Sequence, residues 1–252
     1  SFGGVPYTYE ILDKLRFTRM ELSSLRTMTQ AGGKLTTELH AKFAEYAAQN
    51  GKKFVVMYGQ CEATARMGYL PANMAVEKCG SMGIAIPGGK FTLIDVDGKP
   101  VQEVGKTGEL VYEGPNVTLG YAECGDDLRL GDEHGRILYT GDMAQYDKDG
   151  YFYIVGRKKR FLKIYGNRVN LDEVDRLIKG AFDGIDCASA GVDDHLYIFI
   201  TEESKAKDVK NFVVQKTGLN QAAYQMVVID QIPKNDAGKT LYRELEKYYK
   251  EL

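Results

Sequence analysis

The sequence lacks the features that mark several large classes of protein. Its 252 residues carry 33 Lys and Arg against 35 Asp and Glu, so there is no excess of basic side chains for nucleic acid or anionic lipid. Its longest apolar runs, such as 54–58 and 196–200, are strand-length and far below the roughly 20 residues that cross a bilayer. We therefore expect no nucleic-acid partner and no membrane span.

Cysteine and histidine are also too sparse for a metal or disulfide framework. The four cysteines form no C-x-x-C pair, and only three histidines could join them in a zinc site. Scattered reduced thiols indicate a cytoplasmic protein. The first residues have neither an initiator Met nor the regions of a signal peptide, so we expect the chain to begin inside a longer protein.

The composition is typical of a globular protein, since 44% of residues are hydrophobic and 27% are charged, and the length predicts one or two domains. Apolar residues recur at helical spacing over 34–49, and 52–58 has the pattern of a buried strand that runs into Gly59 and Gln60. This order of elements predicts an α/β unit with a ligand edge at the end of the strand.

The pattern then changes twice along the chain. Short strands near 91–95, 108–113, 143–147 and 151–155 are separated by turns, which is typical of a small β-barrel or sandwich. After 160, helices near 171–182 and 205–216 alternate with strands near 188–192, 196–201 and 226–230, and a last helix begins near 240. The expected fold class is α/β: residues 1–158 form a partial α/β subdomain (1–85) plus a small β-barrel (86–158), and 159–252 form a separate, mobile α+β domain.

Four segments carry residue types that can do chemistry. Residues 58–62 place backbone amides and the Glu62 carboxylate after a strand, where phosphates and a cation can be held, although an ordinary strand exit has the same pattern. Asp142 follows a Gly turn and could accept hydrogen bonds from ribose hydroxyls, or simply close a β-turn. The basic run 157–160 fits a hinge with phosphate-facing cations better than a nucleic-acid patch, given the net charge. Residues 233–239 are expected to form a flexible loop with Lys239 at its tip, which could neutralise a phosphoryl or carboxylate centre, or be solvated.

Together, in this order, the segments resemble the motifs of the adenylate-forming ligases, the superfamily of acyl-CoA synthetases, luciferases and peptide-synthetase adenylation domains. The matching positions are Tyr58, Gly59 and Glu62; Gly108 to Leu110 with Gly114, Gly120 and Tyr121; Thr140 to Asp142; Gly156, Arg157, Lys159, Lys163, Gly166 and Arg168; and Pro233, Lys234, Gly238 and Lys239. The resemblance covers most of the chain and corresponds to the carboxyl-terminal half of such enzymes.

The resemblance implies roles for a subset of these residues and for a few of their neighbours. Lys239 and Glu62 would be catalytic, with Glu62 holding Mg²⁺ and Lys239 bridging carboxylate and phosphate oxygens during adenylation. Asp142 would bind the ribose hydroxyls of ATP or AMP, and Arg157 would assist at ribose or phosphate. The other nucleotide-binding positions would be Gly32, Gly33, Tyr58, Gly59, Gln60 and Cys61. Lys159 would be the hinge, and Lys163, Gly166 and Arg168 would serve the thioester step.

Two departures from the family pattern bear on activity. Cys61 stands where the family usually has Thr, and a thiol is a poorer hydrogen-bond donor to an α-phosphate than a hydroxyl. The family's Ser/Thr/Gly-rich phosphate loop is absent, so we expect the missing amino-terminal portion of the enzyme to be a partner and the chain alone to be inactive.

The expected function is activation of a carboxylic acid with ATP to an acyl-adenylate, followed by transfer to a thiol, with coenzyme A as the co-substrate. An enzyme that loads a carrier protein, or a non-catalytic nucleotide-binding or regulatory fragment, remains an alternative. The sequence names neither the carboxylic acid nor the oligomeric state.

Overall fold

The structure is a computed structural model that describes residues 1–235 and 238–249. The chain divides into two compact units, Ser1–Val155 and Gly156–Leu252, and each unit is described by itself. We call them unit 1 and unit 2. The division falls close to the domain boundary expected at 158/159, and the mobility of the second unit stays a prediction.

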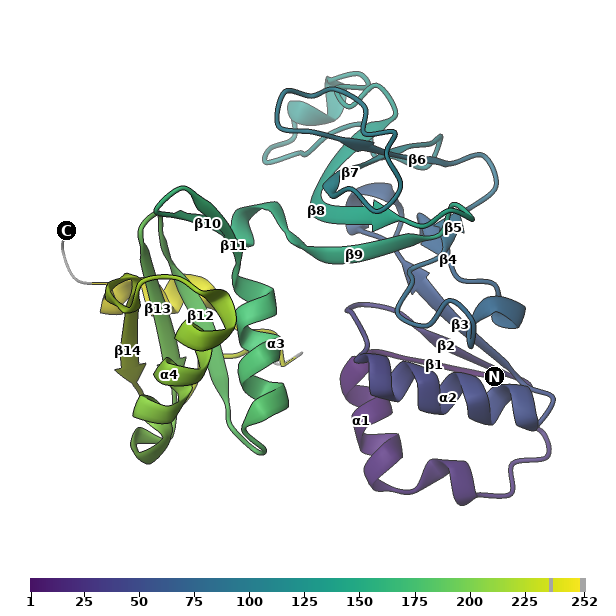
Figure 1. Ribbon diagram of the computed structural model, residues 1–252. Helices are drawn as coiled ribbons and strands as arrows, with labels where there is room; N and C mark the ends of the chain where they lie inside the picture. The colour runs from purple at the N-terminus through teal and green to yellow at the C-terminus, as the bar shows by residue number, and fades with distance from the viewer. Residues whose placement is uncertain (236–237, 250–252) are drawn as a thin grey trace. The chain divides into compact units, whose positions relative to one another are not determined.

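Unit 1 begins with an α/β part built on a five-stranded sheet in the order β1-β2-β3-β4-β5. The strands β1 (Phe2–Gly4), β2 (Thr27–Gln30) and β3 (Lys53–Tyr58) are parallel, and the two-residue strands β4 (Gly68–Tyr69) and β5 (Ile84–Ala85) are antiparallel. Helices α1 (Pro6–Lys14) and α2 (Thr37–Gln49) lie beside the parallel strands (Figure 1). Because parallel strands share one direction, the segments that follow β2 and β3 leave the sheet at the same edge.

The core of this part is aromatic. Tyr9, Phe43 and Phe54 are fully buried, and Tyr9 meets the other two rings edge to face, with ring centroids 4.8 Å apart for Tyr9 and Phe43. Helix α2 starts at Thr36, whose hydroxyl accepts a hydrogen bond from the Leu39 N–H at 3.3 Å. This cap explains why the helix begins three residues later than the apolar spacing predicts.

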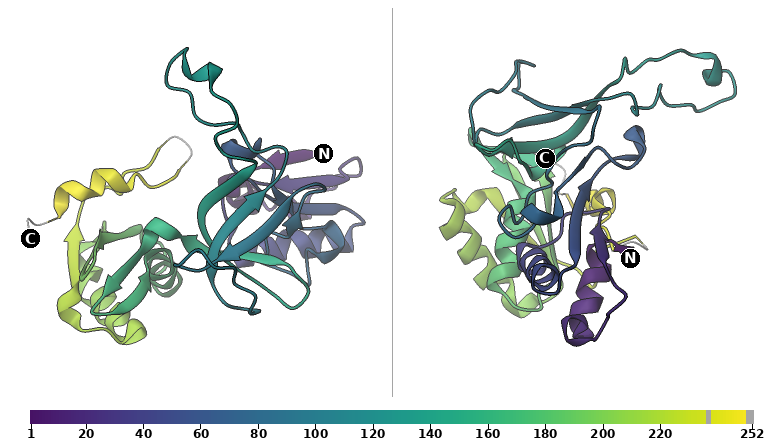
Figure 2. Two further views of the ribbon diagram at one scale, coloured as in Figure 1. Left: turned by 90° about the horizontal axis from the view of Figure 1, so that it is seen from above. Right: turned by 90° about the vertical axis from the view of Figure 1, so that its right-hand side faces the viewer.

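The β-rich part of unit 1 is an open four-stranded sheet and not the small barrel expected from the sequence. Its order is β6 (Lys90–Ile94), β7 (Gly108–Glu113), β8 (Ile137–Tyr146) and β9 (Phe152–Arg157). A barrel requires the two edge strands to pair with each other. Among the described residues the sheet ends at β6 and β9, and Phe152 of β9 bridges to Gly83 instead. The segment between β7 and β8, which carries the short helix η4 (Asp127–Arg129), extends away from this sheet (Figure 2).

Unit 2 is an α+β unit. It contains the hairpin β10 (Phe161–Ile164) and β11 (Asn167–Asn170), helix α3 (Leu171–Ala181), and a sheet in the order β12-β13-β14. Strands β12 (Cys187–Val192) and β13 (His195–Ile200) are antiparallel, and β14 (Tyr224–Val228) lies parallel to β13 after helix α4 (Ala206–Thr217). A one-turn helix α5 (Tyr242–Leu245) follows. Asn170 caps α3, because its side chain accepts a hydrogen bond from the Asp172 N–H at 3.0 Å.

Strand β13 is buried on both faces from Leu196 to Ile200, and these residues are hydrophobic. Leu196, Ile198 and Ile200 pack with residues of α3 and α4, whereas Tyr197 and Phe199 pack with Leu245 and other residues near the carboxyl end. The helices cover one face of the sheet in Figure 1.

The remaining 3-10 turns of the described residues are η1 (Phe17–Arg19), η2 (Cys61–Ala63), η3 (Ala72–Met74), η5 (Lys158–Arg160), η6 (Glu203–Lys205), η7 (Gln221–Ala223) and η8 (Glu246–Tyr248).

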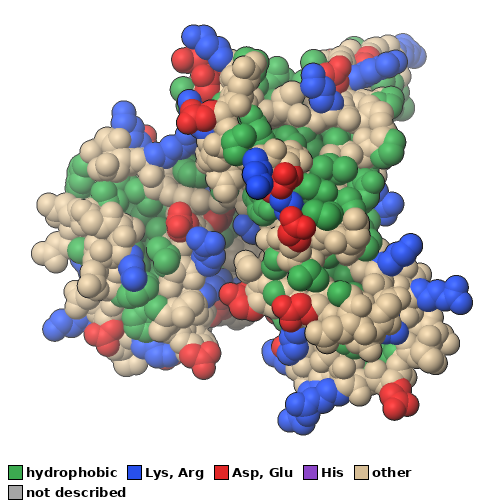
Figure 3. Space-filling view, turned by 45° about the vertical axis from the view of Figure 1, so that its right-hand side comes forward, with side chains coloured by type: hydrophobic (Ala, Val, Ile, Leu, Met, Phe, Trp, Pro, Cys, Tyr) green, Lys and Arg blue, Asp and Glu red, His purple; other side chains and the backbone are tan. Residues whose placement is uncertain are grey.

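The surface carries both signs of charge. On the face shown in Figure 3, Lys and Arg side chains are interspersed with Asp and Glu, in line with the expectation that the chain has no broad basic surface. A search of the described residues finds no helix long and apolar enough to cross a membrane.

Candidate active site

The segment that follows β3 is a tight loop. The Ala65 N–H donates to the Gln60 carbonyl at 3.0 Å, and the Met67 N–H donates to the Tyr58 carbonyl at 2.8 Å. A Cβ at Gly59 would lie 2.3 Å from the Ala65 carbonyl oxygen, so only glycine fits there. Thr64 has a φ of 58°, which is unusual for a β-branched residue. The loop is therefore strained at Thr64, and its hydrogen bonds hold residues 58–62 in a defined conformation.

Asp142 is the centre of a hydrogen-bonded group that joins this loop to β8. The carboxylate is 4% exposed, and its Oδ2 accepts a hydrogen bond from the Tyr58 hydroxyl at 2.6 Å and from Gln60 Nε2 at 3.0 Å. Gln60 Nε2 also donates to the Thr140 carbonyl at 3.0 Å. The structure thus brings together three of the predicted nucleotide-binding residues.

A β-bulge in β8 places Asp142. In the β7–β8 ladder Glu109 pairs with Met143 but Val111 pairs with Tyr139, so residues 140–142 stand opposite Leu110 alone. Gly141 lies in the bulge with a φ of 67°. The Thr140 hydroxyl donates a hydrogen bond from Oγ1 to the Leu110 carbonyl at 2.7 Å, which stabilises the bulge. Asp142 therefore lies inside a bulged strand, and not after a simple turn.

Glu62 lies in η2 and is half-buried. Its Oε1 accepts a hydrogen bond from the Tyr121 hydroxyl at 2.7 Å, and this bond raises the pKa of Tyr121 because it stabilises the protonated phenol. The Thr118 N–H donates to the Glu62 carbonyl at 2.8 Å, which fixes the backbone. Tyr121 is absent from the predicted site residues, although its Gly-Tyr motif was visible in the sequence.

The metal prediction rests on Glu62 alone. The described part of the chain contains no group of three or more His, Cys, Asp or Glu that could hold a metal ion. Mg²⁺ is usually bound by one or two carboxylates together with substrate phosphates, so a single carboxylate fits this ion better than a closed protein cage would. Cys61, next to Glu62, is exposed.

The loop after β2 carries the predicted Gly32 and Gly33. Gly32 has a φ of 80°, in the region that favours glycine. Gln30, fully buried at the end of β2, donates from Nε2 to the Gly33 carbonyl at 2.8 Å. Gln30 thus shapes this loop, and the sequence analysis missed it because a lone Gln at a strand end carries no motif.

In unit 2, Lys239 is exposed at the end of a short loop. The Asn235 side chain accepts a hydrogen bond from the Lys239 N–H at 2.9 Å, and the Asn235 N–H donates to the Lys239 carbonyl at 2.9 Å. Residues 236 and 237, which belong to the predicted loop 233–239, lie outside the described residues. Lys234 at the other end of the loop pairs with Asp186, with Nζ and Oδ2 2.7 Å apart.

The predicted thioester residues share one hairpin. Lys163 of β10 stands opposite Arg168 of β11, and both are exposed. Tyr165 and Gly166 form the two-residue turn with φ of 47° and 86°, the left-handed values of a type I′ turn. A side chain at Gly166 would meet nothing within 4 Å, so the space beside it is open.

The predicted hinge segment opens unit 2. Arg157 and Lys159 are exposed, and Lys159 lies in η5. The Arg157 N–H donates to Asp172 Oδ2 at 3.3 Å, which ties the segment to the first turn of α3.

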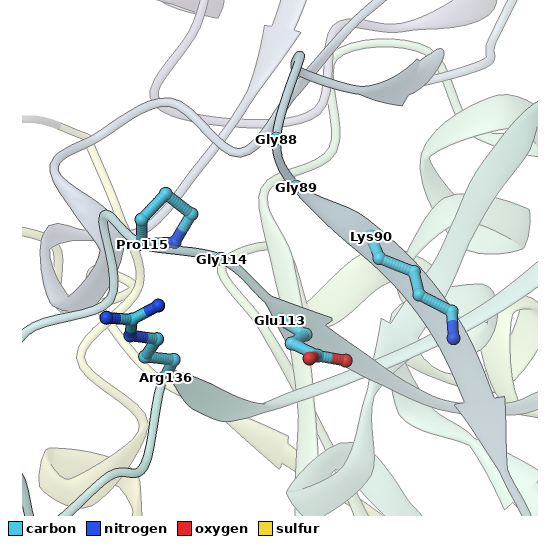
Figure 4. A pocket seen from close by; sticks show the side chains of 7 residues that line it. All are labelled: Gly88, Gly89, Lys90, Glu113, Gly114, Pro115 and Arg136. Carbon is cyan, nitrogen blue, oxygen red and sulfur yellow. The ribbon is translucent and has the colours of Figure 1, made fainter.

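A shallow hollow in the β-rich sheet is separate from these residues. It is lined by Gly88, Gly89, Lys90, Glu113, Gly114, Pro115 and Arg136. Figure 4 shows that its three charged side chains do not converge on one point. None of the predicted nucleotide-binding residues lines it.

Comparisons with known proteins define the class. The model of the AMP-binding enzyme family matches residues 1–122. Among curated relatives, a long-chain-fatty-acid–CoA ligase of Yersinia pestis is 30% identical over 93% of this chain and 42% of its own length. A feruloyl-CoA synthase of an Amycolatopsis species is 34% identical over 76% of this chain and 38% of its own length.

Among solved structures, an o-succinylbenzoate coenzyme A synthetase from Bacillus subtilis in complex with AMP has a TM-score of 0.74 at 22% identity and covers 97% of this chain and 50% of that one. At this identity the likeness shows the fold alone. The chain belongs to the superfamily of adenylate-forming ligases, as its motifs predict. It spans about two fifths of the length of the curated relatives described above.

Proposed function

We propose that this chain is part of an AMP-forming ligase that activates a carboxylic acid and transfers the acyl group to the thiol of coenzyme A. The observation that carries the proposal is the buried Asp142 carboxylate, held at a bulge by Tyr58 and Gln60 beside the loop that bears Glu62. A fixed carboxylate suits the two hydroxyls of a ribose, and the neighbouring strained loop offers backbone amides to phosphate.

In the proposed reaction, a substrate carboxylate oxygen attacks the α-phosphorus of ATP and the bond to pyrophosphate breaks. The sulfur of the thiol then attacks the acyl carbon, AMP leaves, and the thiol proton is released. Both partners of the first step are anionic, so the cation of Lys239 lowers their repulsion in the transition state. Glu62 would hold Mg²⁺, which neutralises phosphate charge when it is bound.

The residues divide between the two half-reactions. Lys239 serves adenylation, whereas the β10–β11 hairpin, with Lys163 and Arg168 on its strands and open space beside Gly166 in its turn, serves the thiol step. Lys159 is the proposed hinge, and Arg157 assists at ribose or phosphate. Coenzyme A is favoured as the acceptor because both curated relatives described above are named for it.

The test is pyrophosphate exchange and AMP release by the longest native polypeptide that carries this sequence, measured with fatty, aryl and amino acids. We expect exchange with at least one acid, a loss of about 10²–10³ in rate for Lys239→Ala, and little change for Lys106→Ala, a matched substitution at an exposed lysine of unit 1. The 252-residue chain alone should give none. Release of ADP in place of AMP, or no exchange with any acid, would contradict the proposal.

A further inference from the structure

Arg160 is a buried arginine that the assignments above leave without a role. It is 8% exposed and follows Lys159 directly, at the end of η5. Its Nε lies 2.8 Å from Asp172 Oδ1 and its Nη2 lies 2.9 Å from Asp175 Oδ2, both on α3, and Nη1 donates to the Ser189 carbonyl of β12. The guanidinium is therefore fixed against both the helix and the sheet of unit 2.

The same guanidinium stacks on an aromatic ring beyond the Lys239 loop. Its central carbon lies 3.8 Å from the ring centroid of Tyr242, the first residue of α5 and the third residue after Lys239. Burial raises the pKa of Tyr242 to about 12, so the ring is neutral and desolvated, the condition in which a cation–π contact is strongest. Arg160 thus joins the segment that follows Lys159 to the segment that follows Lys239.

The other end of the loop is held more weakly. Lys234 and Asp186 form an ion pair in which both side chains are about one third exposed, and such pairs contribute little. A hydrogen bond from the Leu241 N–H to the Pro233 carbonyl at 2.8 Å closes the base of the loop. The contact between Arg160 and Tyr242 is therefore a buried anchor close to Lys239, in addition to the apolar packing of Ile232 and Leu245.

We propose that Arg160 is a positioning residue that, through Tyr242, keeps the Lys239 loop and the segment after Lys159 in a fixed relation within unit 2. The proposal rests on the proposed function in one respect: the anchor contributes to adenylation, which is the half-reaction that uses Lys239. Any rotation about Lys159 would carry an anchored loop with it, whereas an unanchored loop would sample positions away from the reacting oxygens.

The first test needs no activity and uses the 252-residue chain. The rate at which trypsin cleaves after an exposed lysine rises with the population of locally opened chain, so the rate of cleavage after Lys239 reports on the anchor. Cleavage after Lys207 of α4 is the reference within unit 2. Tyr242→Leu removes the ring but keeps the charge network, and Arg160→Lys keeps the charge but loses the planar fork. Both should speed cleavage after Lys239 relative to Lys207 about three- to tenfold.

Two controls separate anchoring from general destabilisation. Tyr242→Phe keeps the ring and should retain most of the protection. Tyr248→Leu makes the same kind of change at a ring that instead lies against Phe199, and it should leave the cleavage ratio unchanged. An unchanged ratio in Tyr242→Leu, or an equal rise in Tyr248→Leu, would overturn the proposal.

The second test measures the two half-reactions in the longest native polypeptide. Tyr242→Leu and Arg160→Lys should slow adenylation about tenfold and change thioester formation from supplied acyl-adenylate by less than about twofold. Equal losses in both half-reactions would refute a positioning role toward Lys239. An inactive wild type would instead refute the proposed function, and the proteolysis ratio would still decide whether the anchor exists.

Discussion

Removal of the Tyr58 hydroxyl should cost more stability than loss of an ordinary hydrogen bond. The hydroxyl lies 2.6 Å from Asp142 Oδ2, and the carboxylate is 4% exposed. A buried hydrogen bond to a charged group is worth about 1.5–3 kcal/mol. Because Gln60 still donates to the same oxygen, we expect Tyr58→Phe to lower the free energy of unfolding by about 2 kcal/mol. In a unit of this size that lowers the melting temperature by about 4–8 °C.

Urea unfolding of the 252-residue chain measures this cost, with Tyr112→Phe as the matched control. The Tyr112 hydroxyl donates at 2.7 Å to Asn116 Oδ1, a neutral acceptor, so its removal should cost about 0.5–1.5 kcal/mol. In an Asp142→Asn background the cost of Tyr58→Phe should fall to the same neutral value. If Tyr58→Phe costs the same in both backgrounds, the carboxylate is not what makes this bond strong.

Three further changes probe other parts of the chain. Gly59→Ala places a Cβ 2.3 Å from the Ala65 carbonyl oxygen, so the AMP affinity of the longest native polypeptide should fall more than about tenfold when it is measured by calorimetry. Gly125→Ala is the control and should leave the affinity unchanged, because a Cβ there meets nothing within 4 Å. Burial raises the pKa of Asp147, but hydrogen bonds from the Tyr151 N–H and Lys78 outweigh it and leave that pKa lowered. Its ionised form therefore stabilises the fold above the unfolded pKa of about 3.9, and this stabilisation is lost as the pH falls. The melting temperature should thus fall less steeply from pH 5 to pH 3 in Lys78→Met than in the wild type; equal slopes would exclude the ion pair as the cause. Gly166→Leu should slow thioester formation at least about tenfold and spare adenylation. Gly166→Asn is the milder control, because Asn tolerates a positive φ. Equal losses in both half-reactions would mean that the space at Gly166 is not a path for the thiol.

The elements with strong periodicity were predicted well. Strand β7 has the predicted bounds 108–113, and β13 and α4 begin within one residue of the predicted 196 and 205. No helix or strand is predicted before residue 34, so α1 and β2 were missed; α1 is nine residues long with only Tyr9 buried, and β2 is four residues long. The β10–β11 hairpin was also missed, since its strands are only four residues long and the hairpin directly follows the basic run 157–160.

The candidate site divides in the same way. Tyr58 and Gln60 were proposed from one segment and Asp142 from another, and the fold brings them within hydrogen-bond distance. The partners Tyr121 and Gln30 were not among the predicted site residues, because a side chain that orients another one leaves no pattern of its own in a single sequence. Roles that depend on bound substrate, such as those of Lys239 and Glu62, stay proposals.

The bulge lies in β8, the one strand that matters most for the site, and the sequence predicts that strand only in part. Leu138, Thr140, Asp142 and Ala144 are buried in alternation, and Met143 between them is buried as well. Because Thr140, Gly141 and Asp142 are residue types that also suit a turn, the sequence predicts a turn at 139–142 and a strand only from 143. Residues 140–142 stand opposite Leu110 alone, so the bulge moves Asp142 two positions out of the register that Tyr139 keeps with Val111. The turn-like residues that hide the strand from sequence analysis thus form the bulge that aims its carboxylate at Tyr58 and Gln60.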